Sequence, residues 1–185
     1  MEMFLIGAGV VVVVMVLMYN YLVGKKNQVD NIFGSVDAVL KQRYDLIPNL
    51  VATAKEYMTH ERETLEKITE LRSQALKQGL DTDTKMNLDA KVSQALGGLM
   101  VAVENYPNLK ANENFLHLQH TLNELEEHIA AARRAYNQSV TDFNNAIEMF
   151  PTNLMAGFMH LERKHVFATP VQERQNVDVN HLFKK

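Results

Sequence analysis

The chain has 185 residues, no cysteine, and 19 basic against 22 acidic residues, which gives a formal net charge of -3. Disulfides and thiolate metal sites are therefore excluded, and nearly balanced charge gives no reason to expect a nucleic-acid partner. Only 8 glycines and 4 prolines are present, so the composition favours helix.

The first segment, residues 1–24, predicts a membrane anchor. About 20 nearly continuous apolar residues follow Met3, and at about 1.5 Å each they cover the roughly 30 Å of a bilayer core. A cleaved signal peptide would begin with basic residues, whereas the only charge here is Glu2. A buried core helix would be shorter and would show a polar face. The expected span includes Phe4, Val12, Leu17 and, near the headgroups, Tyr21.

The charges that flank this segment predict its orientation. Lys25 and Lys26 follow the apolar run directly, and a basic flank usually stays in the cytoplasm. We therefore expect a single-pass protein of the cell (inner) membrane, with the N-terminus outside and the remainder cytoplasmic. The alternative is that residues 25–185 are translocated despite the two lysines.

Residues 25–163 carry a helical pattern throughout. Apolar residues recur every three or four positions over 29–58, 65–76, 86–103 and 116–147, and no alternation is long enough for a sheet. The expected fold is all-α: an N-terminal transmembrane helix, then an up-and-down four-helix bundle with a long first helix. Gly97 and Gly98 interrupt the third stretch and predict close packing against another helix. Residues 164–185 are expected to be a mostly irregular tail.

Three prolines mark changes of direction. Pro48 lies inside the first apolar stretch, where it would free a carbonyl and kink one long helix. It could instead be the first residue of a new helical segment. Pro107 predicts a turn at 105–109, and Pro151 predicts the end of the last long helix.

Several motifs together resemble the LemA family. They are LKQRYDLIPNLV (40–51), HE (60–61), LRSQA (71–75), ENYPNLKA (104–111), LNELEEHIAAARRAYN (122–137), FN (143–144) and FP (150–151). The resemblance covers nearly the whole chain, except that the tail beyond about 165 carries no such motif. It implies a bacterial single-pass membrane protein with a helical bundle. It brings no activity with it, because the family has no established biochemical function.

Nine polar residues lie on or beside apolar helix faces. A buried charge needs a partner, so we expect a polar network inside the bundle, with Arg43, Glu104, Glu126 and Arg133 as its charged members. Such a network either fixes helix register or lines a ligand pocket, and the sequence leaves both open. The full set is Arg43, Asn49, Arg72, Glu104, Glu126, Arg133, Tyr136, Asn137 and Asn144.

The sequence contains only partial matches to the motifs of metal and nucleic-acid sites. HERET at 60–64 resembles the zinc-protease motif, but Thr64 stands where the second histidine is needed. Arg133 and Arg134 lie close to Tyr136, as in some nucleic-acid-binding patches. Acidic residues on the same helix argue against such a patch, which needs many cations on one face. We therefore expect no enzyme, no catalytic residue, no metal and no cofactor.

Two functional hypotheses remain. The first is a membrane-anchored helical scaffold that self-associates as a homo-oligomer or holds other membrane proteins. The alternative is a metal- or ligand-dependent hydrolase or regulator with a polar pocket in the bundle. In both, the lipid bilayer is a partner.

Overall fold

The computed structural model describes residues 1–167, which form six α-helices and contain no β-strand. This confirms the all-α class. The expectations for residues 168–185 lie outside the described part, and the boundaries at 24 and 163 stay predictions. The helices are α1 (Glu2–Lys55), α2 (Arg62–Ala75), α3 (Thr82–Val103), α4 (Pro107–Lys110), α5 (Glu113–Glu148) and α6 (Thr152–Phe158).

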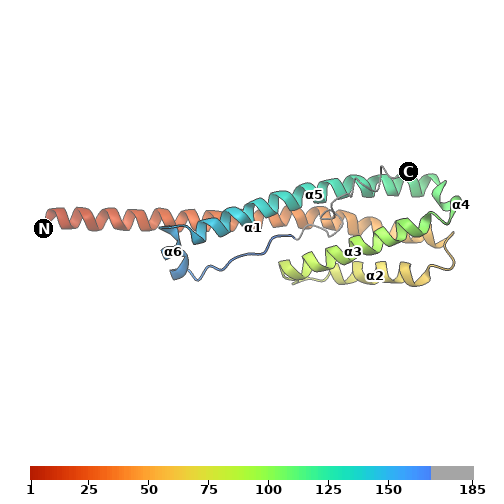
Figure 1. The fold of residues 1–185 in the computed structure, drawn as a ribbon, viewed down its shortest axis with the longest axis horizontal. Helices are drawn as coiled ribbons and strands as arrows, with labels where there is room; N and C mark the ends of the chain where they lie inside the picture. The colour runs from red at the N-terminus through yellow and green to blue at the C-terminus, as the bar shows by residue number, and fades with distance from the viewer. Residues whose placement is uncertain (168–185) are drawn as a thin grey trace, which may run out of the picture.

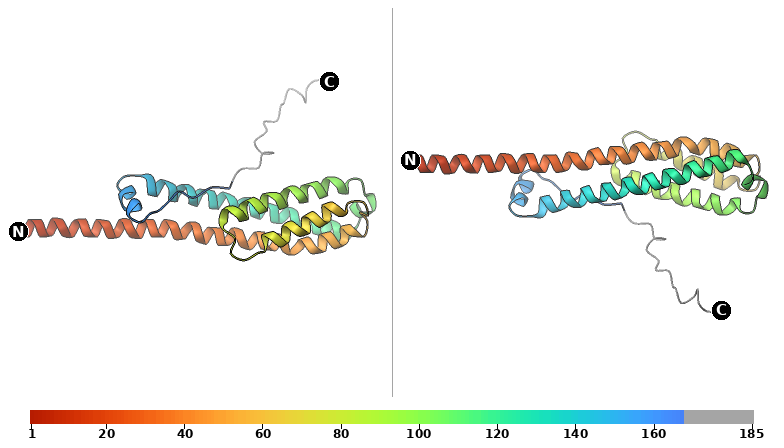
Figure 2. Two further views of the ribbon diagram at one scale, coloured as in Figure 1. Left: turned by 90° about the horizontal axis from the view of Figure 1, so that it is seen from below. Right: turned by 90° about the horizontal axis from the view of Figure 1, so that it is seen from above.

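Helix α1 joins the apolar N-terminus to the packed part of the protein. Its 54 residues form one helix, which at 1.5 Å per residue is about 80 Å long. Its most apolar 18-residue window has a mean hydropathy of 2.3, and none of that window is buried. Figures 1 and 2 show this end of α1 projecting beyond every other element. The helix is therefore long and apolar enough to cross a membrane.

Helices α2 and α3 lie beside the C-terminal part of α1, and α5 runs farther along α1 toward its projecting end (Figure 2). Helix α5 packs along α1 in the antiparallel direction, with Lys25 beside Asp142 and Arg43 beside Glu126. Helix α3 runs parallel to α1, and α2 packs on both α1 and α3. Apolar side chains from all four helices are fully covered, among them Ile47, Ile68, Leu99 and Val140.

Helix ends follow the expected chemistry in part. Asp81 caps α3, because its carboxylate accepts from the backbone N–H and from the hydroxyl of Thr84, each at 2.8 Å. These two hydrogen bonds lower the pKa of Asp81. Helix α2 ends at Ala75 with Leu76 as its C-cap, and Gly79, with a φ of 78°, lies in the turn that leads to α3. Pro107 begins the short helix α4, and Pro151 follows the end of α5.

The expectation for Gly97 and Gly98 was wrong. Both are exposed, and a Cβ built at either position would meet nothing within 4 Å. The covered side of α3 carries Val92, Leu96 and Leu99, and the two glycines lie off that side.

Pro48 lies inside α1, which continues without a break to Lys55. Proline has no N–H, so the carbonyl of Tyr44, four residues earlier, loses its helical donor. Arg72 of α2 supplies the missing hydrogen bond, because its Nε donates to that carbonyl at 2.7 Å. A side chain on one helix thus satisfies the acceptor that a proline on another helix leaves free.

This pairing predicts that Arg72 and Pro48 are energetically coupled. Arg72→Met keeps the aliphatic stem and removes the donor, so it should lower the free energy of unfolding by about 1–2 kcal/mol. With Pro48→Ala, residue 48 regains an N–H for Tyr44, and the cost of Arg72→Met should shrink. Urea unfolding in mild detergent, run as a double-mutant cycle, measures this coupling.

The matched control is Arg62→Met, since Arg62 is exposed and pairs with Glu66 on its own helix. We expect its effect to stay within about 0.5 kcal/mol. An equal cost of Arg72→Met in both backgrounds would contradict the assignment of the Tyr44 carbonyl.

Candidate functional site

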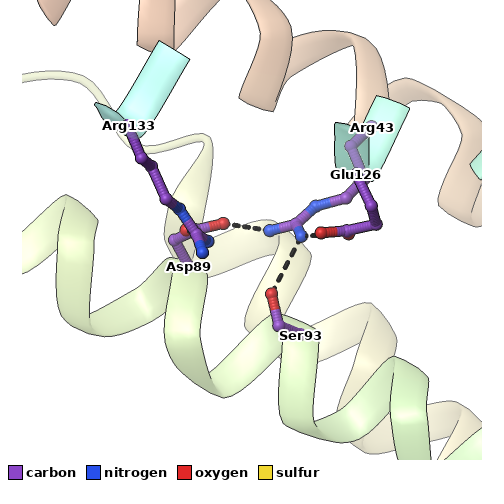
Figure 3. A network of polar contacts seen from close by, with 5 residues as sticks. All are labelled: Arg43, Asp89, Ser93, Glu126 and Arg133. Carbon is purple, nitrogen blue, oxygen red and sulfur yellow. Dashed lines mark hydrogen bonds and ion pairs between the residues drawn. The ribbon is translucent and has the colours of Figure 1, made fainter. Parts of the chain in front are cut away.

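A buried ion network centred on Arg43 is the main polar feature of the helical core (Figure 3). The Arg43 side chain is 0% exposed. It donates to Asp89, to Ser93 at 2.9 Å and to Glu126 at 2.5 Å. Arg133 donates to the second carboxylate oxygen of Asp89. Two cations thus meet two anions, and the cluster is neutral.

Three helices contribute to this network at one level. Arg43 comes from α1, while Asp89 and Ser93 lie one turn apart on α3. Glu126 and Arg133 lie two turns apart on one side of α5, which places them on either side of the α3 carboxylate. The network therefore fastens α1, α3 and α5 to one another.

Electrostatics keeps Arg43 charged despite its burial. Burial lowers the pKa of Arg43, but Asp89 and Glu126 more than offset this, so the pKa is raised overall. The neighbouring Tyr44 is affected too: burial and the charge of Asp89 raise its pKa to about 12. The Arg43 guanidinium also lies 5.6 Å from the centroid of the Tyr44 ring.

The centre of the network is covered, since Arg43 is 0% and Asp89 1% exposed. The described residues line clefts of about 640 Å³, near Met58 and Leu65, and about 380 Å³, near Phe33 and His165, and no network residue lines either cleft. Both Asp89 oxygens already accept from arginines. The arrangement is suited to holding helices together.

Of the polar residues that the sequence predicts for a buried network, some lie in this network and others lie elsewhere in the structure. Arg43, Glu126 and Arg133 are brought together. Glu104 lies outside, as the exposed residue after α3, where it pairs with Lys110 at 2.5 Å. Asn49 is exposed on α1. Arg72, as described above, holds the Tyr44 carbonyl.

The side-chain amides of Asn137 and Asn144 on α5 form hydrogen bonds with the backbone at the end of the described residues. Asn144 donates to the carbonyl of Lys164 at 3.0 Å and accepts from its N–H at 3.0 Å. Asn137 makes the same double contact with Phe167, at 3.1 and 2.7 Å. Asn137 and Asn144 are seven helical residues apart, and Lys164 and Phe167 are three extended residues apart. Both separations are about 10 Å, so both amides can bond the extended segment at once. We call residues 161–167 the strap.

The strap covers one side of the network. The Phe167 ring packs edge-on against Tyr136, with centroids 5.3 Å apart, and lies 5.6 Å from the Arg133 guanidinium. Burial raises the pKa of Tyr136 to about 12. Tyr136 therefore belongs to an aromatic cluster beside the network, and it supports the cover over Arg133.

Sequence reasoning missed Asp89 and Ser93. The signal was present, because Asp89 lies three residues before Val92 and seven before Leu96, which puts a carboxylate on the apolar side of its helix. It also missed a Glu-x-x-His spacing at Glu162 and His165. That pair lies in the strap, and residues 1–167 contain no group of three or more side chains placed to hold a metal.

Comparison with known proteins identifies relatives over nearly the whole chain. The model of the LemA family matches residues 32–181. Protein LemA of Metamycoplasma hominis is 30% identical over 179 residues, which is 97% of this chain and 82% of the relative. Magnetosome protein MamQ 2 of Paramagnetospirillum magneticum is 32% identical over 82 residues, or 44% of this chain. The MamQ of Magnetospirillum gryphiswaldense is 32% identical over 83 residues, and these alignments span only 30% of each MamQ protein.

Removing the central carboxylate should strongly destabilise the fold. Asp89→Asn removes the carboxylate that Arg43 and Arg133 share, so that Arg43 keeps Glu126 and Arg133 loses its pairing with Asp89, and breaking a buried pair costs about 3 kcal/mol or more. We expect a loss of that size in the free energy of unfolding, measured with urea in mild detergent.

Two variants calibrate this result. Glu126→Gln should cost less than Asp89→Asn, because the Glu126 side chain is 44% exposed. Asp45→Asn removes an exposed partner of Lys41 and should change stability by less than about 0.5 kcal/mol. If Asp89→Asn behaves like Asp45→Asn, the buried network is not a structural fastening.

Proposed function

Because the chain belongs to the LemA family, we propose that it is a membrane-anchored helical scaffold that self-associates and presents its helices to other membrane proteins. The observation that carries this proposal is α1, one helix that is an exposed apolar rod at one end and a core element at the other. A tether of this kind raises the effective concentration of partners in the plane of the membrane.

In this proposal α1, α2, α3 and α5 act as one up-and-down four-helix bundle, and α1 bends at Pro48 to stay against its neighbours. The ion network supports the first part, since it ties α1, α3 and α5 at one level. Arg72 supports the second, since it holds the freed Tyr44 carbonyl. The bundle then stands on the membrane as a rigid unit.

The proposed location is the cell membrane, with the N-terminus outside and the helical domain in the cytoplasm. Lys25 and Lys26 at the inner end of the apolar run support this orientation. The hydrolase or regulator alternative has no comparable support from residues 1–167, because the charged network lines neither of their clefts.

Single-cysteine labelling tests the anchor and its orientation. The chain has no cysteine, so Glu2→Cys and Lys77→Cys each create one exposed thiol, one on either side of the proposed span. In intact spheroplasts a membrane-impermeant maleimide should label Glu2→Cys but label Lys77→Cys only after lysis. The reverse pattern would overturn the orientation, and labelling of both before lysis would overturn the span.

Crosslinking in native membranes tests the scaffold itself. A short lysine-reactive crosslinker applied to the full chain should give homo-oligomer bands, and particles purified in mild detergent should have a matching mass. The control is the same reaction after dilution into excess detergent, where collisional crosslinks disappear and specific ones persist. A monomer in both conditions, with no co-purifying protein, would count against a scaffold.

A further inference from the structure

The corner between α5 and α6 lies beside the end of the apolar segment of α1. Lys25 of α1 is 3.5 Å from Asp142 of the antiparallel helix α5. Glu148, the last residue of α5, is six residues past Asp142, and thus about 9 Å nearer the N-terminal end of α1. That distance corresponds to six residues of α1, so the corner reaches the level of Tyr19.

Burial along α1 gives the same position independently. Every residue before Met18 is exposed, Met18 is half-buried, and Leu22 is fully covered. Helix α6 packs against α1, and Figures 1 and 2 show it at the end of α5, with the rest of α1 projecting beyond it. The corner therefore covers the last turns of the apolar segment.

The outer side of this corner is apolar. Met149 is 64% exposed, Phe150 80%, Leu154 58% and Phe158 84%. Among the described residues beyond Tyr21, eight large hydrophobic side chains are exposed, and these four are half of them. Leu154 and Phe158 lie one helical turn apart, while Ala156 between them is buried. The corner is thus covered on its inner side and bare on its outer side.

We propose that this corner, residues 149–158, is a second membrane contact, embedded at the boundary between headgroups and acyl chains of the bilayer that α1 crosses. The inference rests on the proposed anchor. Tyr19 lies about four residues, or roughly 6 Å, inside the end of the apolar run at Val23. That is within the 5–10 Å depth at which interfacial apolar faces reside.

Lipid fits this surface better than a second copy of the chain does. Once α1 spans the bilayer, anything level with Tyr19 is already in the interfacial layer, so no further association is needed to cover Phe150 and Phe158. Two phenylalanines, a leucine and a methionine match the apolar side of that boundary. Exposed Lys26, just past the apolar run, lies where anionic headgroups are.

Such a contact would fix the rotation of α1 in the membrane. A lone transmembrane helix can rotate about its axis. When the apolar corner is attached to one side of α1, the corner reaches the interfacial layer at only one rotation and one depth of α1. The helical domain would then keep a fixed face toward the bilayer surface.

Tryptophan fluorescence tests this contact, because the chain has no tryptophan of its own. Phe158→Trp probes the corner and Val12→Trp probes the span; Val101→Trp, 73% exposed at the distal end of α3, is the matched control. Each full-length variant is reconstituted in vesicles of phosphatidylcholine and phosphatidylglycerol, with and without lipids brominated near the headgroup or deep in the chains.

We expect Phe158→Trp to emit at shorter wavelength than Val101→Trp and to be quenched most by shallow bromines. Val12→Trp should be quenched most by deep bromines, and Val101→Trp by neither. Quenching of Val12→Trp without quenching of Phe158→Trp would overturn the corner contact and leave the anchor standing. If neither is quenched, the anchor itself fails. A blue-shifted but unquenched Phe158→Trp would mean that protein covers the corner, which also overturns the inference.

Discussion

Arg43 sets the position of the helices around it. A guanidinium that is 0% exposed costs several kcal/mol without a partner, so the core accepts only arrangements in which Asp89 and Glu126 reach it. A slip of one turn by α3 or α5 would separate these groups by about 5 Å and leave a bare charge in the core. The same register brings Asp142 to Lys25, and through it the α5–α6 corner to the level of the apolar segment.

This network favours one arrangement rather than the greatest stability. Within residues 1–167, the Nε atoms of Arg43 and Arg133 are buried and have no hydrogen-bond partner, and well-packed apolar residues often replace such clusters without loss of stability. The Tyr44 carbonyl that Pro48 leaves without a helical donor also favours one arrangement, because Arg72 reaches this carbonyl only when α2 is correctly placed against α1. One stretch, KQRYDLIPNL at 41–50, therefore fixes α1 against α2, α3 and α5 with two polar constraints at adjacent residues, the Arg43 side chain and the Tyr44 carbonyl.

Periodicity was enough to predict the helices, because a repeating apolar stripe needs only local sequence. The same stripes located Arg43, Glu126 and Arg133, which lie on or beside covered faces. Glu104 was misplaced because α3 ends one residue earlier, at Val103, and a residue at a helix end can turn to solvent. Asn137 and Asn144 lie two turns apart on one side of α5, and their partners are backbone groups of the strap. No spacing rule encodes such partners, since they depend on how the chain returns along the helix.

The central claim is that the Arg43 network, and not apolar packing alone, selects the register of α1 against α5. Spin labels at Lys26→Cys and Thr141→Cys, exposed positions on these two helices, report that register as a distance by pulsed electron paramagnetic resonance. The informative comparison is with the quadruple variant Arg43→Met, Asp89→Leu, Glu126→Gln and Arg133→Met, which removes all four charges of the network and keeps an apolar core. We expect one narrow distance in the parent chain and a broadened or split distribution in the variant. A single narrow distribution at an unchanged distance in both proteins would contradict the claim.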